Sequence, residues 1–222
     1  MMNRFQMSDI DKTANIHFIG IGGISMSGLA QIVLKDGYAV SGSDWNKSAI
    51  TEKLENMGAD IVYGHGAVNE DGINKASLVV YTAAAKADNP EIVLAKEKGI
   101  RLIDRAEFLG AIMKNYKHAV GVSGTHGKTT TSSMLAHLLK QSPVDCNAFL
   151  GGILKNYESN LMLSDTSDFT VIEADEFDRS FHWLTPYMAV ITSADPDHLD
   201  IYGTAEAYRE SFEKFTSLIR PD

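Results

Sequence analysis

Residues 120–131 read Val120-Gly121-Val122-Ser123-Gly124-Thr125-His126-Gly127-Lys128-Thr129-Thr130-Thr131. An apolar run leads into glycines and then into Gly-Lys-Thr, which is typical of a strand, a phosphate-binding loop and the start of a helix. In such a P-loop, backbone N–H groups surround phosphate oxygens, the lysine contacts the β- and γ-phosphates, and a hydroxyl binds Mg²⁺. The stretch therefore predicts an α/β domain that binds nucleotide phosphates.

The generic P-loop motif is not met in full, because Val122 stands where its first glycine would fall. The shorter core Gly-Thr-His-Gly-Lys-Thr-Thr remains, with a strand before it and a helical pattern after it. The alternative interpretation is a glycine turn followed by an ordinary surface lysine.

Acidic residues follow two later apolar runs. A P-loop needs an acid at the end of a neighbouring strand to hold magnesium, and Glu173 is the first residue beyond the run 169–172. A plain solvated acidic turn would have the same composition, since Glu176 and Asp178 follow closely. His198 lies in the loop 194–200 and could ligate a metal, hold a phosphate or simply be exposed.

An earlier glycine turn, residues 20–28, joins a strand to a helix. Its glycines would let the backbone approach a pyrophosphate at a helix N-terminus, and Asp44 follows the second strand, where it could accept a ribose hydroxyl. The turn departs from the strict dinucleotide pattern, because Ser25 occupies the third glycine position. The alternative is a tight turn in which Asp44 caps the following segment.

Strand and helix patterns alternate along the chain, which indicates βαβ units and a parallel sheet. We expect a Rossmann-like parallel-sheet domain over residues 14–115, followed by part of a P-loop ATPase-type α/β domain over 116–222, with residues 1–13 as a flexible tail. The expected strands are 15–19, 38–41, 60–63, 76–82, 101–103, 117–122, 146–150, 169–173 and 188–192; the expected helices are 25–35, 48–57, 89–98, 128–140 and 204–219. Thr204 is the expected N-cap of the last helix.

The composition narrows the class of protein. The 222 residues carry 20 Lys and Arg against 29 Asp and Glu, so the net charge of −9 argues against a nucleic-acid partner. A single cysteine, Cys146, excludes an internal disulfide framework, and we expect it to be a buried hydrophobe. Met134 and Leu138 are expected in the core. Without a candidate membrane span or signal peptide, the default is a soluble cytosolic protein.

Taken together, five segments of the sequence resemble the Mur ligases, the ATP-dependent amide-bond ligases of peptidoglycan precursor and cell wall synthesis. The resemblance covers nearly the whole chain from about residue 15, and it is closest to the members that add L-alanine to UDP-N-acetylmuramate. The segments that carry it are residues 17–28, Ser41-Gly42-Ser43-Asp44, 124–131, Glu173-Ala174-Asp175-Glu176 and Asp197-His198-Leu199-Asp200.

The resemblance implies roles for individual residues. The first domain would hold a UDP-sugar and not a nicotinamide cofactor, with Asp44 near the uridine and with Gly22, Gly23, Ile24, Ser25, Met26, His65 and Thr82 as further contacts. Lys128 would bind the ATP phosphates and Thr129 one Mg²⁺, whereas Glu173 and His198 would help to hold a second Mg²⁺. Lys128, Glu173 and His198 are thus the expected catalytic residues, and the ATP site would comprise Gly124, Thr125, His126, Gly127, Lys128, Thr129 and Thr130.

The implied reaction is cytoplasmic and joins the small molecules UDP-N-acetylmuramate, L-alanine and ATP through an acyl phosphate. The family has a further part of the ATP domain and a third domain for the amino acid, and this sequence contains neither, so we expect no ligase turnover from the 222-residue chain alone. The alternatives are a ligase that recycles a tripeptide onto the same UDP-sugar and a non-catalytic nucleotide-binding fragment. A nicotinamide-dependent dehydrogenase would leave residues 124–131 unexplained.

Overall fold

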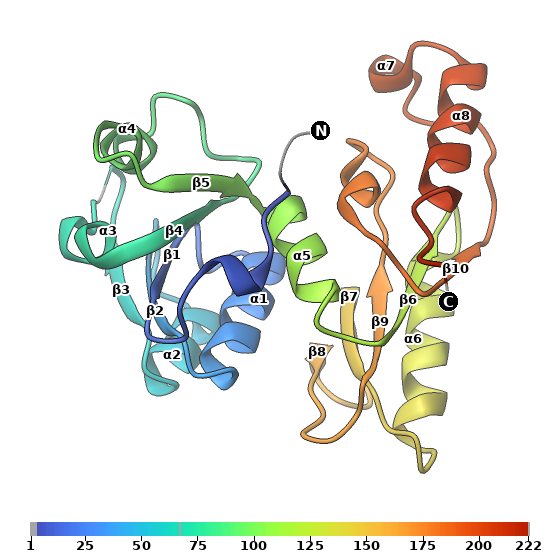
Figure 1. Cartoon of the computed structure of the whole chain (residues 1–222), viewed down its shortest axis with the longest axis horizontal. Coiled ribbons are helices and arrows are strands. Elements are labelled where there is room, and N and C mark those ends of the chain that lie inside the picture. The colour runs from blue at the N-terminus through green and yellow to red at the C-terminus, as the bar shows by residue number, and fades with distance from the viewer. Residues whose placement is uncertain (1–3, 67, 222) are drawn as a thin grey trace. The chain divides into compact units, whose positions relative to one another are not determined.

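The structure is a computed structural model that describes residues 4–66 and 68–221 (Figure 1). It divides into two compact units, Met1–Phe108 and Leu109–Asp222. The division falls inside helix α5 (Arg105–Met113), a few residues before the expected boundary at 115/116.

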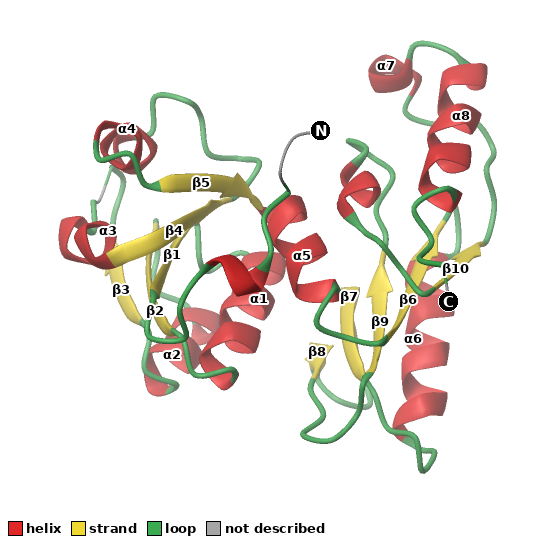
Figure 2. Cartoon of the chain, viewed as in Figure 1, coloured by secondary structure: helices red, strands yellow, loops and turns green. Residues whose placement is uncertain are grey.

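The first unit is built on a sheet of five parallel strands in the order β3-β2-β1-β4-β5 (Figure 2). All five side chains of β1 are buried, as expected for a strand covered on both faces. Strand order reverses between β1 and β4, and ligands of open α/β sheets bind at such a switch point, beyond the carboxyl ends of the strands. The strands are β1 (Asn15–Ile19), β2 (Ala39–Asp44), β3 (Asp60–Tyr63), β4 (Ala76–Tyr81) and β5 (Arg101–Asp104).

Side-chain caps fix the starts of three helices in this unit. Ser48, Asn69 and Asn89 each accept a hydrogen bond from a backbone N–H in the first turn that follows, which satisfies donors that have no intrahelical partner. Helix α3 was not expected, because it is only six residues long and has an internal glycine, and α5 was not expected either. The helices are α1 (Ile24–Lys35), α2 (Ala49–Asn56), α3 (Glu70–Lys75), α4 (Pro90–Glu97) and α5.

Within the expected flexible tail, Phe5 and Met7 are buried, while residues 1–3 lie outside the described part of the chain. The Phe5 ring is buried and stacks on Phe108, with ring centroids 6.3 Å apart. The backbone N–H of Phe5 donates to Glu107 Oε1 at 3.2 Å, and Met7 is buried in a short 3-10 turn. Apolar side chains in this segment therefore fasten it to the first unit.

The second unit has a five-stranded sheet in the order β10-β6-β9-β7-β8. Its pairs are parallel except β7 with β8, which are antiparallel. We expected four strands here; β8 was missed because Ser159-Asn160-Leu161-Met162 is short and half polar. The strands are β6 (His118–Ser123), β7 (Asn147–Leu154), β8 (Ser159–Met162), β9 (Phe169–Glu173) and β10 (Met188–Ile191).

Helix α6 (Lys128–Lys140) packs against β7 and β9 of this sheet. Its apolar face comprises Leu135, Ala136 and Leu139. Met134 and Leu138, which we expected in the core, are 61% and 64% exposed, because their positions on the helix turn them away from that face.

The remaining helices of the second unit are α7 (Leu199–Tyr202) and α8 (Ala205–Thr216). Thr204 caps α8 as expected, since its hydroxyl accepts from Ala207 N at 3.1 Å. Cys146 is buried in the core of this unit, also as expected. Among the described residues, no helix is both long and apolar enough to cross a membrane.

Candidate functional site

The glycine loop of the second unit follows β6, the strand between β9 and β10. Gly124 has φ +136° and Gly127 has φ +82°, so both adopt the left-handed region that favours glycine. A Cβ on Gly124 would also clash with the Thr192 hydroxyl and the Ser193 backbone. A glycine loop therefore forms between β6 and α6, with Gly124 and Gly127 at the positions that need glycine.

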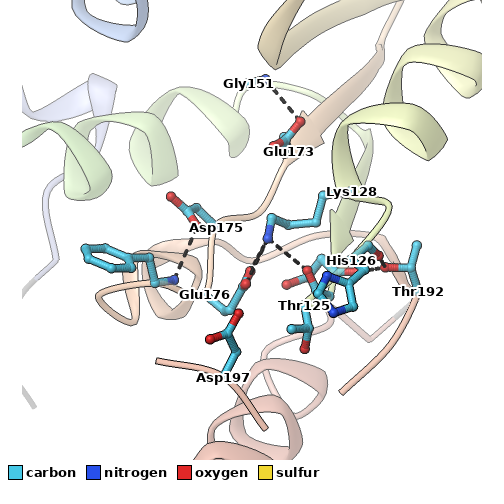
Figure 3. Close-up of polar contacts among 12 residues, drawn as sticks. Thr125, His126, Lys128, Gly151, Glu173, Asp175, Glu176, Thr192 and Asp197 are labelled. Atoms are coloured by element: carbon cyan, nitrogen blue, oxygen red, sulfur yellow. Dashed lines mark hydrogen bonds and ion pairs between the residues drawn. The ribbon is translucent and has the colours of Figure 1, made fainter. Parts of the chain in front are cut away.

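The segment after β10 holds this loop. Ser193 O accepts from Thr125 N at 3.1 Å, and Ser193 Oγ accepts from His126 N at the same distance. The Thr125 hydroxyl donates to Asp195 O at 2.7 Å, and Thr192 donates to His126 O (Figure 3). Thr125 and His126 are therefore hydrogen-bonded to a segment about 70 residues further along the chain.

Lys128 begins α6, and its side chain turns back into the loop (Figure 3). The ammonium donates to Gly124 O and to Glu176 Oε1, both at 2.8 Å, and lies 2.7 Å from Glu176 Oε2. The Glu176 side chain is only 1% exposed and that of Lys128 16%. The lysine expected to bind phosphate is thus held by a buried carboxylate.

Glu173 is the last residue of β9, and its side chain contacts the first turn of α6. Its Oε1 accepts from the Thr129 hydroxyl at 3.0 Å, while Oε2 accepts from Gly151 N at 3.1 Å and lies 3.4 Å from Ser132 Oγ. A Cβ on Gly151 would clash with this carboxylate, so the strand approaches it closely only because residue 151 is glycine. A carboxylate beside a hydroxyl at a phosphate loop fits Mg²⁺, which takes one or two protein oxygens plus phosphate oxygens.

His198, the third residue expected at the metal, is the N-cap of α7. Its backbone has φ +51°, its Nε2 is 3.8 Å from Asp197 Oδ2, and its ring contacts Phe177. Within the described part of the chain, no group of three or more His, Cys, Asp and Glu side chains could hold a metal ion. The structure therefore brings Thr129 and Glu173 into contact, and the role of His198 at a metal stays a prediction. Thr130, also expected at the phosphates, is exposed in the first turn of α6.

The glycine turn of the first unit follows β1, beside the switch point of its sheet. Gly20 has φ +77°, and a Cβ there would lie 2.9 Å from Thr82 Cγ2. Gly22 N donates to Asp44 Oδ2 at 2.8 Å, and a Cβ on Gly22 would clash with that carboxylate. Thr82 and Asp44 therefore flank the turn from opposite neighbours of β1.

The other residues expected at this turn have separate surroundings. Gly23 is the N-cap of α1; Ile24, Ser25 and Met26 follow it, so their N–H groups have no intrahelical partner. The Met26 side chain is buried, so only its backbone can reach a ligand. Ser25 Oγ accepts from the Arg105 guanidinium at 3.1 Å, which places a cation at the start of the helix. His65 lies one strand further away, against Trp45.

A buried polar cluster lies in the sheet behind the turn. Glu91 Oε1 accepts from Asn69 N at 2.8 Å and lies 3.3 Å from His17 Nε2, while Oε2 accepts from the Ser43 hydroxyl. Burial raises the pKa of the Glu91 carboxyl, but the contacts with His17, Ser43 and Asn69 N outweigh burial and hold that pKa below its ordinary value. Glu91 is thus a buried, charged group that ties β1, β2 and α4 together.

Several residues of these two sites were not predicted from the sequence. In the sequence, Glu176 is marked only by its place in an acidic run, and the pair Gly151-Gly152 is the signal that could have indicated a close approach of that strand to Glu173. Thr192 and Arg105 have no such signal in the sequence, because each reaches its glycine turn through a contact that is distant in sequence.

Two family models match the chain. Residues 15–117 match the model described as the Mur ligase family, catalytic domain, and residues 122–222 match the Mur ligase middle domain. Together they span both glycine turns and the acidic strand end at Glu173.

Curated relatives agree with the two family matches. The chain is 64% identical over 217 residues to the UDP-N-acetylmuramate--L-alanine ligase of Parabacteroides distasonis, covering 96% of this chain and 47% of the relative. It is 50% identical to the enzyme of that name from Clostridium botulinum, covering 96% and 45%. The chain thus spans about half the length of the curated relatives that it matches.

Solved structures share the fold. A ligase for UDP-N-acetylmuramate and L-alanyl-gamma-D-glutamyl-meso-diaminopimelate from Neisseria meningitides superposes with a TM-score of 0.83 at 31% identity, covering 95% of this chain and 69% of that one. The UDP-N-acetylmuramate-alanine ligase of Thermotoga maritima gives 0.80 at 35% identity, covering 92% and 47%.

Proposed function

The chain belongs to the Mur ligase family, and from this premise we propose that it carries the UDP-sugar site and the phosphate loop of a UDP-N-acetylmuramate–L-alanine ligase. The observation that carries the proposal is that each unit has a glycine turn at the carboxyl edge of its own sheet. The names of relatives that are 64% and 50% identical support the choice of L-alanine as the added amino acid.

In this proposal the second unit binds ATP. Backbone N–H groups at the start of α6 and the ammonium of Lys128 meet the phosphate oxygens, where the positive end of the helix adds to the attraction. Thr129 and Glu173 are the residues that would hold Mg²⁺. When bound, that ion would neutralise charge on the phosphates.

The first unit binds the UDP part of the sugar nucleotide. Gly22, Gly23 and the first turn of α1 offer N–H groups to the diphosphate, and Arg105 supplies a positive charge beside them. Asp44 keeps acceptor capacity beyond its bond to Gly22 N, because a carboxylate has about four lone-pair sites, and it can accept a ribose hydroxyl.

The reaction would proceed in the cytoplasm in two steps. A lactyl carboxylate oxygen attacks the γ-phosphorus of ATP and expels ADP, which gives an acyl phosphate. The amine of L-alanine then attacks the acyl carbon, loses a proton and expels inorganic phosphate, so that an amide forms. Two anions must meet in the first step, and the ammonium of Lys128 lowers their repulsion where charge develops on the transferred group.

A ligase that joins a tripeptide to the same sugar nucleotide is a second candidate. It is favoured by the similarity to the Neisseria meningitides ligase, whose name includes such a peptide. The first unit and the phosphate loop serve either reaction, so the acceptor must be tested directly.

Calorimetric titration of the 222-residue chain tests the two sites separately. We expect UDP-N-acetylmuramate to bind, ATP to bind with Mg²⁺, and Lys128→Ala to lose only ATP. Lys140→Ala is the matched control, since Lys140 ends the same helix and pairs with Asp145. If neither ligand binds and NAD binds instead, the proposal is wrong.

A chimera tests the reaction. The chain would be extended with the part of the Parabacteroides distasonis relative that it does not match, and phosphate release would be measured with L-alanine or the tripeptide. We expect release with L-alanine. Release only with the tripeptide would favour the second candidate, and binding without release from either acceptor would support a nucleotide-binding role alone.

A further inference from the structure

We propose that Trp45 is a stacking residue for the base of the nucleotide sugar bound by the first unit, an inference that rests on the proposed UDP-sugar site. Trp45 follows Asp44 directly at the carboxyl end of β2. Its side chain is 67% exposed, the largest value among the exposed large apolar side chains of the described residues. An indole so exposed at the ligand-binding edge of a sheet offers a flat face to an aromatic ring.

The indole is held in place from the neighbouring strand. The rings of Trp45 and His65 lie with centroids 4.8 Å apart at an interplanar angle of 42°. Strands β2 and β3 are parallel and pair Asp44 with Tyr63, so the turns that follow them emerge at the same edge. Gly64 N donates to Asp44 O at 3.0 Å and joins the two turns. The strand ends therefore support Trp45, although its side chain remains outside the core.

Asp44 links this platform to the glycine turn. Its Oδ2 is bonded to Gly22 N, and Gly22 lies just before the helix start that would receive the diphosphate. A nucleotide with its diphosphate at α1 and its ribose at Asp44 must direct its base beyond β2. Trp45 is the next residue along the chain at that point, so its indole lies where the base would emerge.

Stacking on an aromatic ring uses the face of a base and tolerates any base, so we assign Trp45 to affinity and not to the choice of uracil. The exposure of the side chain separates this role from a structural one. Trp45→Ala removes little buried surface, and we expect unfolding by urea to be unchanged in that variant.

The two tryptophans of the chain make a direct test possible. Trp45 lies in the first unit and Trp183 in the second, so Trp183→Phe leaves Trp45 as the sole indole. A second substitution, Lys128→Ala, keeps UDP phosphates from binding at the other loop. In this double variant we expect UDP to quench the fluorescence of Trp45.

Affinity is then measured by calorimetry in the Lys128→Ala chain. We expect Trp45→Ala to weaken UDP binding about tenfold, and Trp45→Phe to retain most of the affinity because a ring remains. Normal UDP affinity in Trp45→Ala overturns the stacking role and leaves the UDP-sugar site standing. Failure of UDP to bind the chain with Trp45 intact overturns both proposals.

Discussion

The ammonium of Lys128 lies 2.7 Å from Oε2 of Glu176, a carboxylate with only 1% of its side chain exposed. The same ammonium donates to Gly124 O, so carbonyl and carboxylate oxygens engage the group that would receive the phosphates of ATP. Glu176 is itself fastened, because its backbone carbonyl accepts from the Tyr202 hydroxyl. The Glu176 carboxylate therefore occupies the Lys128 ammonium, and the triphosphate of ATP must compete with this carboxylate for it.

Glu176→Gln should tighten ATP binding and destabilise the unliganded protein. The substitution removes a negative charge next to the triphosphate and frees the lysine, for a gain of about tenfold in affinity. It also weakens a charged hydrogen bond, at a cost of about 2 kcal/mol in unfolding free energy. Asp178→Asn is the matched control, since it removes the same charge from the exposed side of the segment. Weaker ATP binding by Glu176→Gln would show instead that the carboxylate aims the lysine.

Glu173→Gln should reduce the dependence of ATP binding on Mg²⁺. The amide keeps one acceptor oxygen, which can serve Thr129 Oγ1 or Gly151 N, but loses the charge that favours a divalent cation. Titrations of ATP with Mg²⁺ and with EDTA should show a gain from the metal that is on the order of tenfold smaller than in the parent chain. Glu213→Gln, on the exposed face of α8, should leave the gain unchanged. An equal gain in the two variants would place the metal elsewhere.

Those parts of the fold that depend on local sequence could be predicted from the residues alone. Four predicted elements match the observed ones residue for residue: the strands 15–19, 60–63 and 169–173 and the helix 128–140. Buried parallel strands are largely apolar runs, and the glycines next to them mark where they end. Strand β8 and helix α3 were missed, since their formation depends on pairing with β7 and on a cap by Asn69.

Among the site residues too, those in one contiguous stretch could be predicted and those brought in by distant contacts could not. Glycines and the lysine of the phosphate loop are contiguous, so a single stretch of sequence predicted them. Glu176 reaches Lys128 across 48 positions and Arg105 reaches Ser25 across 80, and no spacing rule connects such pairs before the sheet is assembled. His198 stays a prediction as a metal ligand, and its ring contacts Asp197 and Phe177 in this structure.

Cys146 should resist thiol reagents in the folded protein. Burial, with a smaller contribution from Asp145, raises the pKa of its thiol to about 11, so about one molecule in a thousand carries a thiolate at pH 8. Labelling with a disulfide reagent at pH 8 should be slow in buffer and complete in urea. In the Met134→Cys variant, one thiol on the exposed face of α6 should react fast while Cys146 stays protected. Fast reaction of both thiols would contradict the buried position of Cys146.

Glu91→Ala should destabilise the first unit by about 3 kcal/mol. The carboxylate accepts from Asn69 N and Ser43 Oγ inside the protein, and its removal leaves both donors and His17 without their partner. Hydrogen exchange of amides in β1 and β2, followed by mass spectrometry, reports this unit without interference from the other. Glu97→Ala is the matched control, since Glu97 ends the same helix and is exposed. Equal exchange in the two variants would contradict the role of Glu91.

The same cluster predicts how the first unit responds to acid. Because the pKa of Glu91 is lower in the folded chain than its ordinary value of 4.5, the unfolded state takes up the proton first as pH falls. The stability that this group contributes is therefore complete above about pH 5 and is lost as pH falls through the folded pKa. Glu91→Gln cannot titrate, so its exchange rates in β1 should change less between pH 6 and pH 4, after correction for intrinsic exchange, than those of the parent chain. An equally steep pH dependence in Glu91→Gln would assign the acid response to another group.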